Sequence, residues 1–154
     1  MSFSHLISSN QGSIFEKQVM IMAVYKQPDD IKVIGIAVKT FPHGIKEAFD
    51  SLMKTLGTER SYYGVSWMDE RNNVIYYAMA AESFPGEEKL HGYESLIIEK
   101  GEYKTEAIYN WLSKTDSIKD IFHHLMGNDT PDKNHPCIEW YQSDDEMLCM
   151  IRVV

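Results

Sequence analysis

Apolar side chains recur every three or four positions in two segments of the chain, which predicts two amphipathic helices. The first segment covers residues 45–56, where charged residues fill most positions between the apolar ones. The second covers residues 118–126, and Gly127 is placed to end that helix. The apolar positions are Ile45, Ala48, Phe49, Leu52, Met53 and Leu56 in the first segment, and Ile118, Ile121, Phe122, Leu125 and Met126 in the second.

Two short apolar runs separated by turn residues follow each helix. Residues 62–68 and 74–82 follow the first helix, and residues 137–142 and 147–153 follow the second. Runs of this length around a polar turn are typical of a β-hairpin. We therefore expect each helix to lead into a two-stranded antiparallel unit.

An extended apolar segment also precedes each helix and is interrupted by proline or glycine. The first segment covers residues 19–25 and 33–40, and the second covers residues 95–98 and 103–109. Such an interruption indicates either a hairpin or a bulge that bends one long strand. The sequence does not choose between these two structures.

The chain repeats itself at an offset of 73 residues. The repeat matches residues 45–53 with 118–126, 65–67 with 138–140 and 74–81 with 147–154, and it continues without a gap into the first strands. An internal repeat of this kind decides the architecture. We expect an α+β fold in which two pseudo-symmetric βαββ repeats form one antiparallel sheet, with both helices on one side and a shallow groove on the other.

The repeat also defines the domain organisation. A chain of 154 residues is long enough for one domain with a buried core. We expect a single domain over residues 1–154, with the first repeat at about 18–82 and the second at about 93–154. Residues 1–15 are expected to form a flexible arm.

Strand alternation assigns the side chains around position 139 to two faces. Ile138 and Trp140 share one face, and their repeat equivalents Val65 and Trp67 are also apolar. Because this face is apolar in both repeats, we expect it to pack under the helices. The opposite face of the same strand is then the one that lines the groove.

Glu139 and Tyr141 fall on the predicted groove face, with Ser66 and Met68 as their repeat equivalents. A carboxylate between apolar neighbours is costly unless it is paired or hydrogen-bonded. Either Arg152 on the neighbouring strand pairs with Glu139, or a ligand supplies the positive charge or a donor, or the carboxylate lies at a wet edge or is satisfied by local hydrogen bonds. Aromatic rings near the strands suit a cationic ligand.

Charge and composition exclude several classes of function. The formal net charge is −8 and no Lys/Arg cluster occurs, which argues against a nucleic-acid partner. No apolar run reaches the roughly 20 residues that span a bilayer, and the first residues do not form a signal peptide, so the expected location is the cytoplasm. Cys137 and Cys149 lack a metal-ligand spacing, and no nucleotide-binding motif occurs. We expect neither a metal nor a cofactor.

Four short segments occur in a characteristic order: YGVS at residues 63–66, IYYA at 75–78, IEKGEY at 98–103 and IEWY at 138–141. In order and spacing they resemble the GyrI-like small-molecule-binding domain, also called the AraC effector-binding or bacterial transcription activator effector-binding domain. The resemblance covers residues 18–154. It implies a concave antiparallel sheet with two helices on its outer face, and an acidic residue in the penultimate strand that meets cationic or drug-like ligands.

The same resemblance assigns roles to individual residues. Glu139 occupies the position of the acidic residue. The resemblance also implies that Tyr77 and Tyr141 are aromatic residues beside it. The chain departs from the family where Asn110 and Trp111 replace a glycine-bearing turn, so Trp111, with Tyr109 before it, is expected at the mouth of the groove. Relatives often carry a helix-turn-helix domain before this module, and the N-terminal arm is too short for one.

We therefore expect a stand-alone protein that binds a small hydrophobic, drug-like organic molecule, either cationic or uncharged, as a regulator or as a sequestering protein. One alternative is a hydrolase of reactive small molecules, with Glu139 as acid or base and Tyr141 assisting. A second alternative is an inhibitor that acts by binding another protein. The sequence does not decide whether the protein is a monomer or a homodimer.

Overall fold

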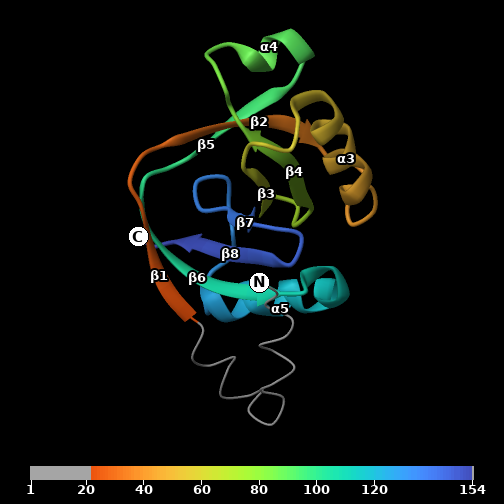
Figure 1. The fold of residues 1–154 in the computed structure, drawn as a ribbon. Helices are drawn as coiled ribbons and strands as arrows, with labels where there is room; N and C mark the ends of the chain where they lie inside the picture. Colours follow the sequence, from red (N-terminus) through yellow and green to blue (C-terminus); the bar gives the residue numbers. More distant parts are fainter. Residues whose placement is uncertain (1–21, 154) are drawn as a thin grey trace.

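In the computed structural model, residues 22–153 form one curled antiparallel sheet of eight strands with helices on its outer side (Figure 1). This confirms the predicted α+β fold class. The expected flexible arm, residues 1–15, and the first few residues of the first repeat lie outside the described residues. Within residues 22–153, no helix is long and apolar enough to cross a membrane.

The two halves of the chain contain the same succession of elements. The first half consists of β1 (Met22–Gln27), β2 (Ile31–Ala37), α3 (Ile45–Leu56), β3 (Tyr62–Met68) and β4 (Val74–Ala81). A short helix, α4 (Glu87–His91), leads to β5 (Glu94–Ile98), β6 (Gly101–Tyr109), the 3₁₀ helix η2 (Trp111–Lys114), α5 (Thr115–Met126), β7 (Cys137–Tyr141) and β8 (Glu146–Arg152).

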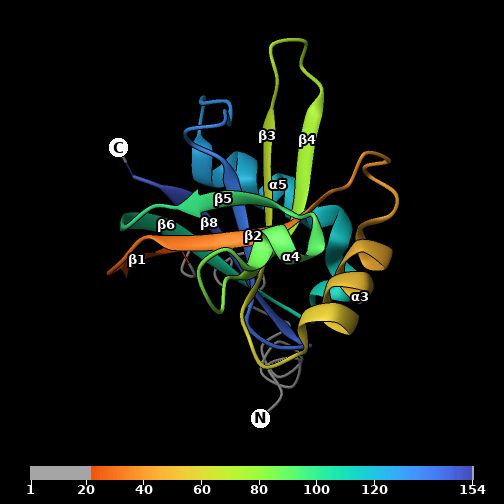
Figure 2. The same ribbon diagram turned by 90° about the horizontal axis from the view of Figure 1, so that it is seen from above.

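The strand order is β1-β6-β8-β7-β3-β4-β2-β5, so the two halves meet where β3 pairs with β7. At this junction Val65 lies opposite Ile138, its equivalent at an offset of 73 residues. The pseudo-twofold axis therefore passes through the middle of the sheet. Seen from above, the β3–β4 hairpin extends beyond the neighbouring strands (Figure 2).

The first strand of each half pairs with the other half. β1 pairs with β6, and β5 pairs with β2, whereas β1 and β2 are not neighbours in the sheet. The proline and glycine interruptions therefore bend one extended segment, and they do not form hairpins. Each bent segment crosses from one half to the other and ties the halves together (Figure 1).

Strand pairing shows that the repeat is gapless only from the helices onward. Tyr77 lies opposite Val65 and Met150 lies opposite Ile138, which keeps the offset of 73 residues. One strand further out, Ala37 lies opposite Tyr77 and Thr105 lies opposite Met150, an offset of 68. The predicted gapless match of the first strands was wrong, because the two halves use different numbers of residues between their second strand and their helix.

The helices cover the outer face, and a separate core fills the inner face. α3 packs on β4, and α5 packs on β8 and β6. The inner cluster contains Val33, Tyr63, Val65, Met79, Ile98, Tyr103, Ile138 and Met150, with Trp140 packed against it. The predicted face assignment was therefore wrong: Ile138 and Trp140 point away from the helices. Curvature closes the inner face on itself, so that face is as apolar as the one under the helices.

Candidate functional site

Glu139 lies on the helix-bearing face of β7, in the middle of the sheet, and is 8% exposed. Its Oε1 accepts hydrogen bonds from the hydroxyls of Tyr76 and Tyr141, each at 2.6 Å. The two hydroxyl oxygens are 3.2 Å apart. Among residues 22–153, no Lys, Arg or His forms an ion pair with Glu139. The carboxyl group is thus buried with two neutral donors, and the described part of the chain supplies no compensating charge.

A glycine on the neighbouring strand makes room for this cluster. Gly64 of β3 lies directly opposite Glu139. A Cβ added at position 64 would overlap both the Tyr76 hydroxyl oxygen and Oε1 of Glu139. Because glycine presents no side chain, Tyr76 can reach from β4 across β3 to the carboxyl group on β7.

Aromatic rings from both halves surround the two tyrosines. The Phe41 ring stacks on Tyr76, with ring centroids 5.3 Å apart. Phe49 of α3 packs edge-on against Tyr141 at 5.0 Å, and Trp111 of η2 approaches the same ring at 5.0 Å. The carboxyl group therefore sits between the α3 side and the η2 side, beneath rings that can face a cation.

Burial controls the ionisation of this cluster. The pKa of Glu139 is raised because desolvation penalises the carboxylate, and the hydrogen bonds from Tyr141 and Tyr76 offset only part of this effect. The pKa values of Tyr76 and Tyr141 are raised well above the usual value, first by burial and then by the adjacent Glu139 charge. The tyrosines therefore remain donors, and Glu139 can either hold a proton or hold a charge that attracts a cation.

The thiols beside Glu139 are not suited to act as nucleophiles. Cys149 lies opposite Glu139 on β8, and Cys137 lies two residues before it on the same face. Burial raises the pKa of Cys137 to about 12, and it raises the pKa of Cys149 as well. Both therefore stay as buried thiols, and the reactive capacity of the site rests with the carboxyl group.

Three of the residues predicted from the sequence come together in the structure: Glu139, Tyr141 and Trp111. Ser66 lies on the same face, opposite Cys137, and Met68 follows at the end of β3. The backbone N–H of Met68 donates to the carbonyl of Pro131 at 3.2 Å. Ser66 is two residues further along β3 than Gly64, which lies opposite Glu139, and Met68 lies beyond the last residue of β3 that pairs with β7.

Tyr77 and Tyr109 lie on the opposite face from Glu139. Tyr77 stacks on Trp67 with ring centroids 5.6 Å apart and donates to Oε1 of Glu94 at 3.1 Å. Tyr109 shares its strand face with Tyr103, which belongs to the inner core. The two residues were grouped with Glu139 by sequence reasoning, and strand alternation separates them from it.

Arg152 does not neutralise Glu139. Its Nη1 lies 3.3 Å from Oε2 of Glu99. Arg152 follows Met150 on the inner face of β8, whereas Glu139 points to the outer face. The structure therefore contradicts pairing with Arg152. It also contradicts a wet edge, because Glu139 is 8% exposed, and it supplies two local hydrogen bonds to Oε1.

Sequence reasoning missed Tyr76 and Gly64. Tyr76 alternates with Tyr77 along β4, so its placement beside Glu139 depends on the register of three strands. The signal that was present is the glycine inside an apolar strand, which often marks a close approach of other groups.

No protein-family model and no curated protein matches the chain. Several solved structures share its fold at low identity. An integron cassette protein from the mobile metagenome of Vibrio cholerae aligns over 88% of this chain and 97% of that chain, with 13% identity and a TM-score of 0.62. A protein named SAV2435, solved bound to tetraphenylphosphonium, aligns over 86% and 94%, with 10% identity and a TM-score of 0.57.

A hydrolase from Listeria innocua aligns over 92% of this chain and 98% of that chain, with 13% identity and a TM-score of 0.51. At these identities the likeness shows a common fold. What these proteins bind or catalyse is a property of each of them.

Proposed function

We propose that this protein is a member of the GyrI-like small-molecule-binding domains and binds hydrophobic organic cations at Glu139, as a regulator or a sequestering protein. The observation that carries the proposal is the carboxyl group of Glu139. It is buried at the junction of the two halves, with two tyrosine donors and no ion pair to a cation of residues 22–153.

The charge of the buried Glu139 carboxylate favours binding of a cation. Moving a carboxylate out of water costs several kcal/mol unless a cation or a full set of donors replaces the solvent. The two tyrosine hydroxyls supply part of that replacement. A ligand cation beside Oε2 supplies the rest, and it interacts more strongly there than it would in water.

The aromatic rings give the ligand its chemical class. Trp111, Phe49 and Tyr141 present ring faces and edges around the carboxyl group. Rings of this kind bind apolar surface and also attract a cation. A compact cation that carries aromatic or aliphatic groups satisfies both requirements. The fold shared with the tetraphenylphosphonium-bound protein supports this choice of class.

Entry of the ligand requires Trp111 to move. The Trp111 ring lies against Tyr141 and is half-buried. Its Nε1 makes a long 3.4 Å hydrogen bond to the carbonyl of Ser143. The 3₁₀ helix that carries it begins after Asn110, a residue in the left-handed region with φ of 56°. In our proposal this short segment swings aside when the ligand enters.

Titration calorimetry with tetraphenylphosphonium tests the proposal. We expect saturable binding that weakens at least about tenfold in Glu139→Gln, a loss of about 1.4 kcal/mol or more. Glu94→Gln is the matched control, because Glu94 is an exposed acid that bonds Tyr77 on the other face. Tetraphenylborate has the same shape and the opposite charge and should not bind. Equal affinity of wild type and Glu139→Gln would contradict the proposal.

A second candidate function is hydrolysis of a strained electrophile such as an epoxide. It is favoured by a buried carboxyl group with a raised pKa beside two phenolic donors, an arrangement that suits a general acid. Glu139 would give its proton to the ring oxygen as the carbon–oxygen bond opens. Water would attack the carbon and return a proton to the carboxylate, so that the diol is the product.

Styrene oxide separates the two candidates. Conversion to the diol by the wild type, and loss of conversion in Glu139→Gln, would favour the hydrolase. Binding of tetraphenylphosphonium without any turnover of styrene oxide would favour the binding protein.

A further inference from the structure

Only one oxygen of the Glu139 carboxyl group takes part in hydrogen bonds within residues 22–153. Oε1 accepts from the hydroxyls of Tyr76 and Tyr141, each at 2.6 Å, and no donor of these residues bonds to Oε2. A carboxylate has acceptor sites on both oxygens, whereas a carboxylic acid carries a proton on one of them. Two donors on Oε1 therefore leave Oε2 as the place for a proton or for a cation.

The side chains packed around Glu139 and its two tyrosines are neutral. They come from β4, β7, β8, α3 and η2, and they comprise Tyr76, Tyr141, Cys137, Cys149, Phe49 and Trp111. The charged residues of α3 and α5 are exposed. Within residues 22–153, burial and the two tyrosine hydrogen bonds set the pKa of Glu139, so Lys114 of η2 does not compensate its charge. These elements therefore bring no counterion to the carboxyl group.

A second buried carboxyl group lies on the same face of the sheet. Cys149 of β8 pairs with Glu106 of β6 on one side and with Glu139 of β7 on the other. The backbones of the two acids are therefore two strand spacings, or about 10 Å, apart. Glu106 is 4% exposed, and its Oε1 has no hydrogen-bond partner within residues 22–153. Glu106 can add negative charge to this face, and it cannot neutralise Glu139.

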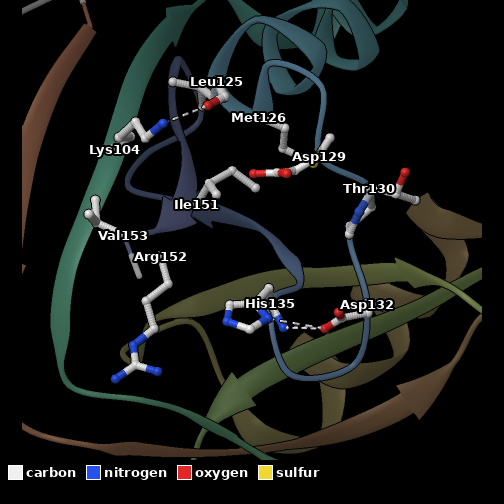
Figure 3. A pocket seen from close by; sticks show the side chains of 11 residues that line it. Lys104, Leu125, Met126, Asp129, Thr130, Asp132, His135, Ile151, Arg152 and Val153 are labelled. Carbon is white, nitrogen blue, oxygen red and sulfur yellow. Dashed lines mark hydrogen bonds and ion pairs between the residues drawn. The ribbon is translucent and has the colours of Figure 1, made fainter.

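Lys104 is the cation on this face of β6, and it is held at the end of α5. Its ammonium group donates to the carbonyl of Leu125 at 3.3 Å (Figure 3). There it borders a cavity of about 460 Å³ that the loop after α5 helps to form. Within residues 22–153, no ion pair joins Lys104 to Glu106 or to Glu139. Both buried acids are thus without a cation from the described part of the chain.

A carboxyl group in such surroundings is more stable with its proton. Ionisation without a cation would leave a charge in a medium that solvates it poorly, and buried groups of this kind take up a proton instead. The raised pKa of Glu139 agrees with this preference. A ligand cation beside Oε2 reverses it, because the cation attracts the carboxylate much more strongly than the neutral acid. Proton and cation therefore compete for the same oxygen.

We propose that organic cations bind by exchange with a proton: Glu139 is protonated at Oε2 in the empty site, and the cation displaces that proton into the solvent. Exchange of this kind rests on the proposed binding of cations at Glu139. The O–H bond of the acid breaks, the proton passes to water or buffer, and the carboxylate remains as the partner of the ligand. Affinity therefore rises with pH until the empty site has lost its proton, and it is constant above that point.

Titration calorimetry with tetraphenylphosphonium, in two buffers of different protonation enthalpy, counts the released protons. The ligand has no titratable group, so any proton comes from the protein. We expect up to one proton per bound ligand at acid pH, decreasing toward zero at alkaline pH. Affinity should gain up to about tenfold per pH unit while the release persists. Constant affinity without proton release between about pH 5 and 8 would overturn the exchange and leave cation binding intact, whereas absence of binding would overturn both.

Infrared spectroscopy of the free protein tests the protonated state of the empty site without a ligand. At about pH 6, above the ordinary glutamate pKa of 4.5, exposed carboxyl groups are ionised. The wild type should then show a carboxylic acid band that is missing in Glu139→Gln and disappears when tetraphenylphosphonium is added. Glu106→Gln is the matched control from the same face, and it should keep both this band and the proton release. Identical spectra of the wild type and Glu139→Gln would overturn the proposal.

Discussion

At the scale of single residues, the site depends on Gly64, which has no side chain. Gly64 leaves the space in which the Tyr76 hydroxyl meets Glu139, and any Cβ there would overlap both groups. The hydrogen bond from Tyr76 on β4 to Glu139 on β7 therefore requires glycine at position 64 on β3, the strand that lies between them. Replacement of this glycine would disturb the site without changing any of the polar residues.

We predict that Gly64→Ala lowers the free energy of unfolding by about 1–3 kcal/mol, the usual cost of overpacking a tight core. Tetraphenylphosphonium binding should weaken in the same variant, because Tyr76 or Glu139 has to move. Urea denaturation measures the first effect, with Ser66→Ala on the same strand face as the control. A Gly64→Ala protein as stable as the wild type would contradict this account, because it would show that Tyr76 and Glu139 can make room for a Cβ at position 64 without cost.

The raised pKa of Glu139 makes stability depend on pH in a defined direction. The folded state holds the Glu139 proton more tightly than the unfolded state, whose reference pKa is 4.5. This contribution to stability is complete below pH 4.5 and is lost as pH rises through the higher folded pKa. The wild type should therefore lose stability relative to Glu139→Gln between acid and neutral pH.

Urea unfolding of both proteins at several pH values measures this difference. Glu106 is also buried with a raised pKa, but it is present in both proteins and its effect cancels. A constant gap between the two proteins, or a gap that changes in the opposite direction, would contradict the account of Glu139.

At the scale of elements, helix periodicity and turn residues were enough to predict both main helices and both hairpins. Pairing between distant strands was not predictable in the same way. The exchange of β1 and β5 between the halves depends on how the bent segments cross the molecule, and local sequence carries no signal for it. The face of Glu139 was missed because Ile138 packs in an inner core that is as apolar as the helix side.

The η2 segment is the element that we expect to control ligand entry. Trp111→Ala should increase the association rate of tetraphenylphosphonium several-fold, since Tyr141 and Glu139 are then less covered. Dissociation should also accelerate, because one ring wall is lost. Stopped-flow fluorescence measures both rates. The exposed neighbour provides the control Leu112→Ala, and an association rate equal to that of the wild type in Trp111→Ala would exclude a gating role.

At the scale of the whole molecule, the duplication explains the sheet, but the polar residues of the site occur in only one of the two halves. Glu139 and Tyr141 correspond to Ser66 and Met68 in the first half, so the two halves contribute differently to a site near their shared axis. The repeat could therefore predict the architecture and mark Glu139 as an exception within it. It could not predict Tyr76 and Phe41, because these reach the site from the other half through contacts distant in sequence.

The net charge of −8 also acts on the molecule as a whole. A negative protein attracts small cations over a distance of about one Debye length, so association with Glu139 ligands should slow as salt is added. A neutral ligand of the same size should show no such dependence. Association rates of tetraphenylphosphonium at low and high salt measure this effect.

A crystal structure of the complex with tetraphenylphosphonium tests the central claim most directly. We predict that the phosphonium lies over the Glu139 carboxylate, between α3 and η2, with Trp111 moved from its contact with Tyr141. A phosphonium bound instead beside Trp67 and Tyr77 on the inner face, with Glu139 unchanged beneath its rings, would contradict the account.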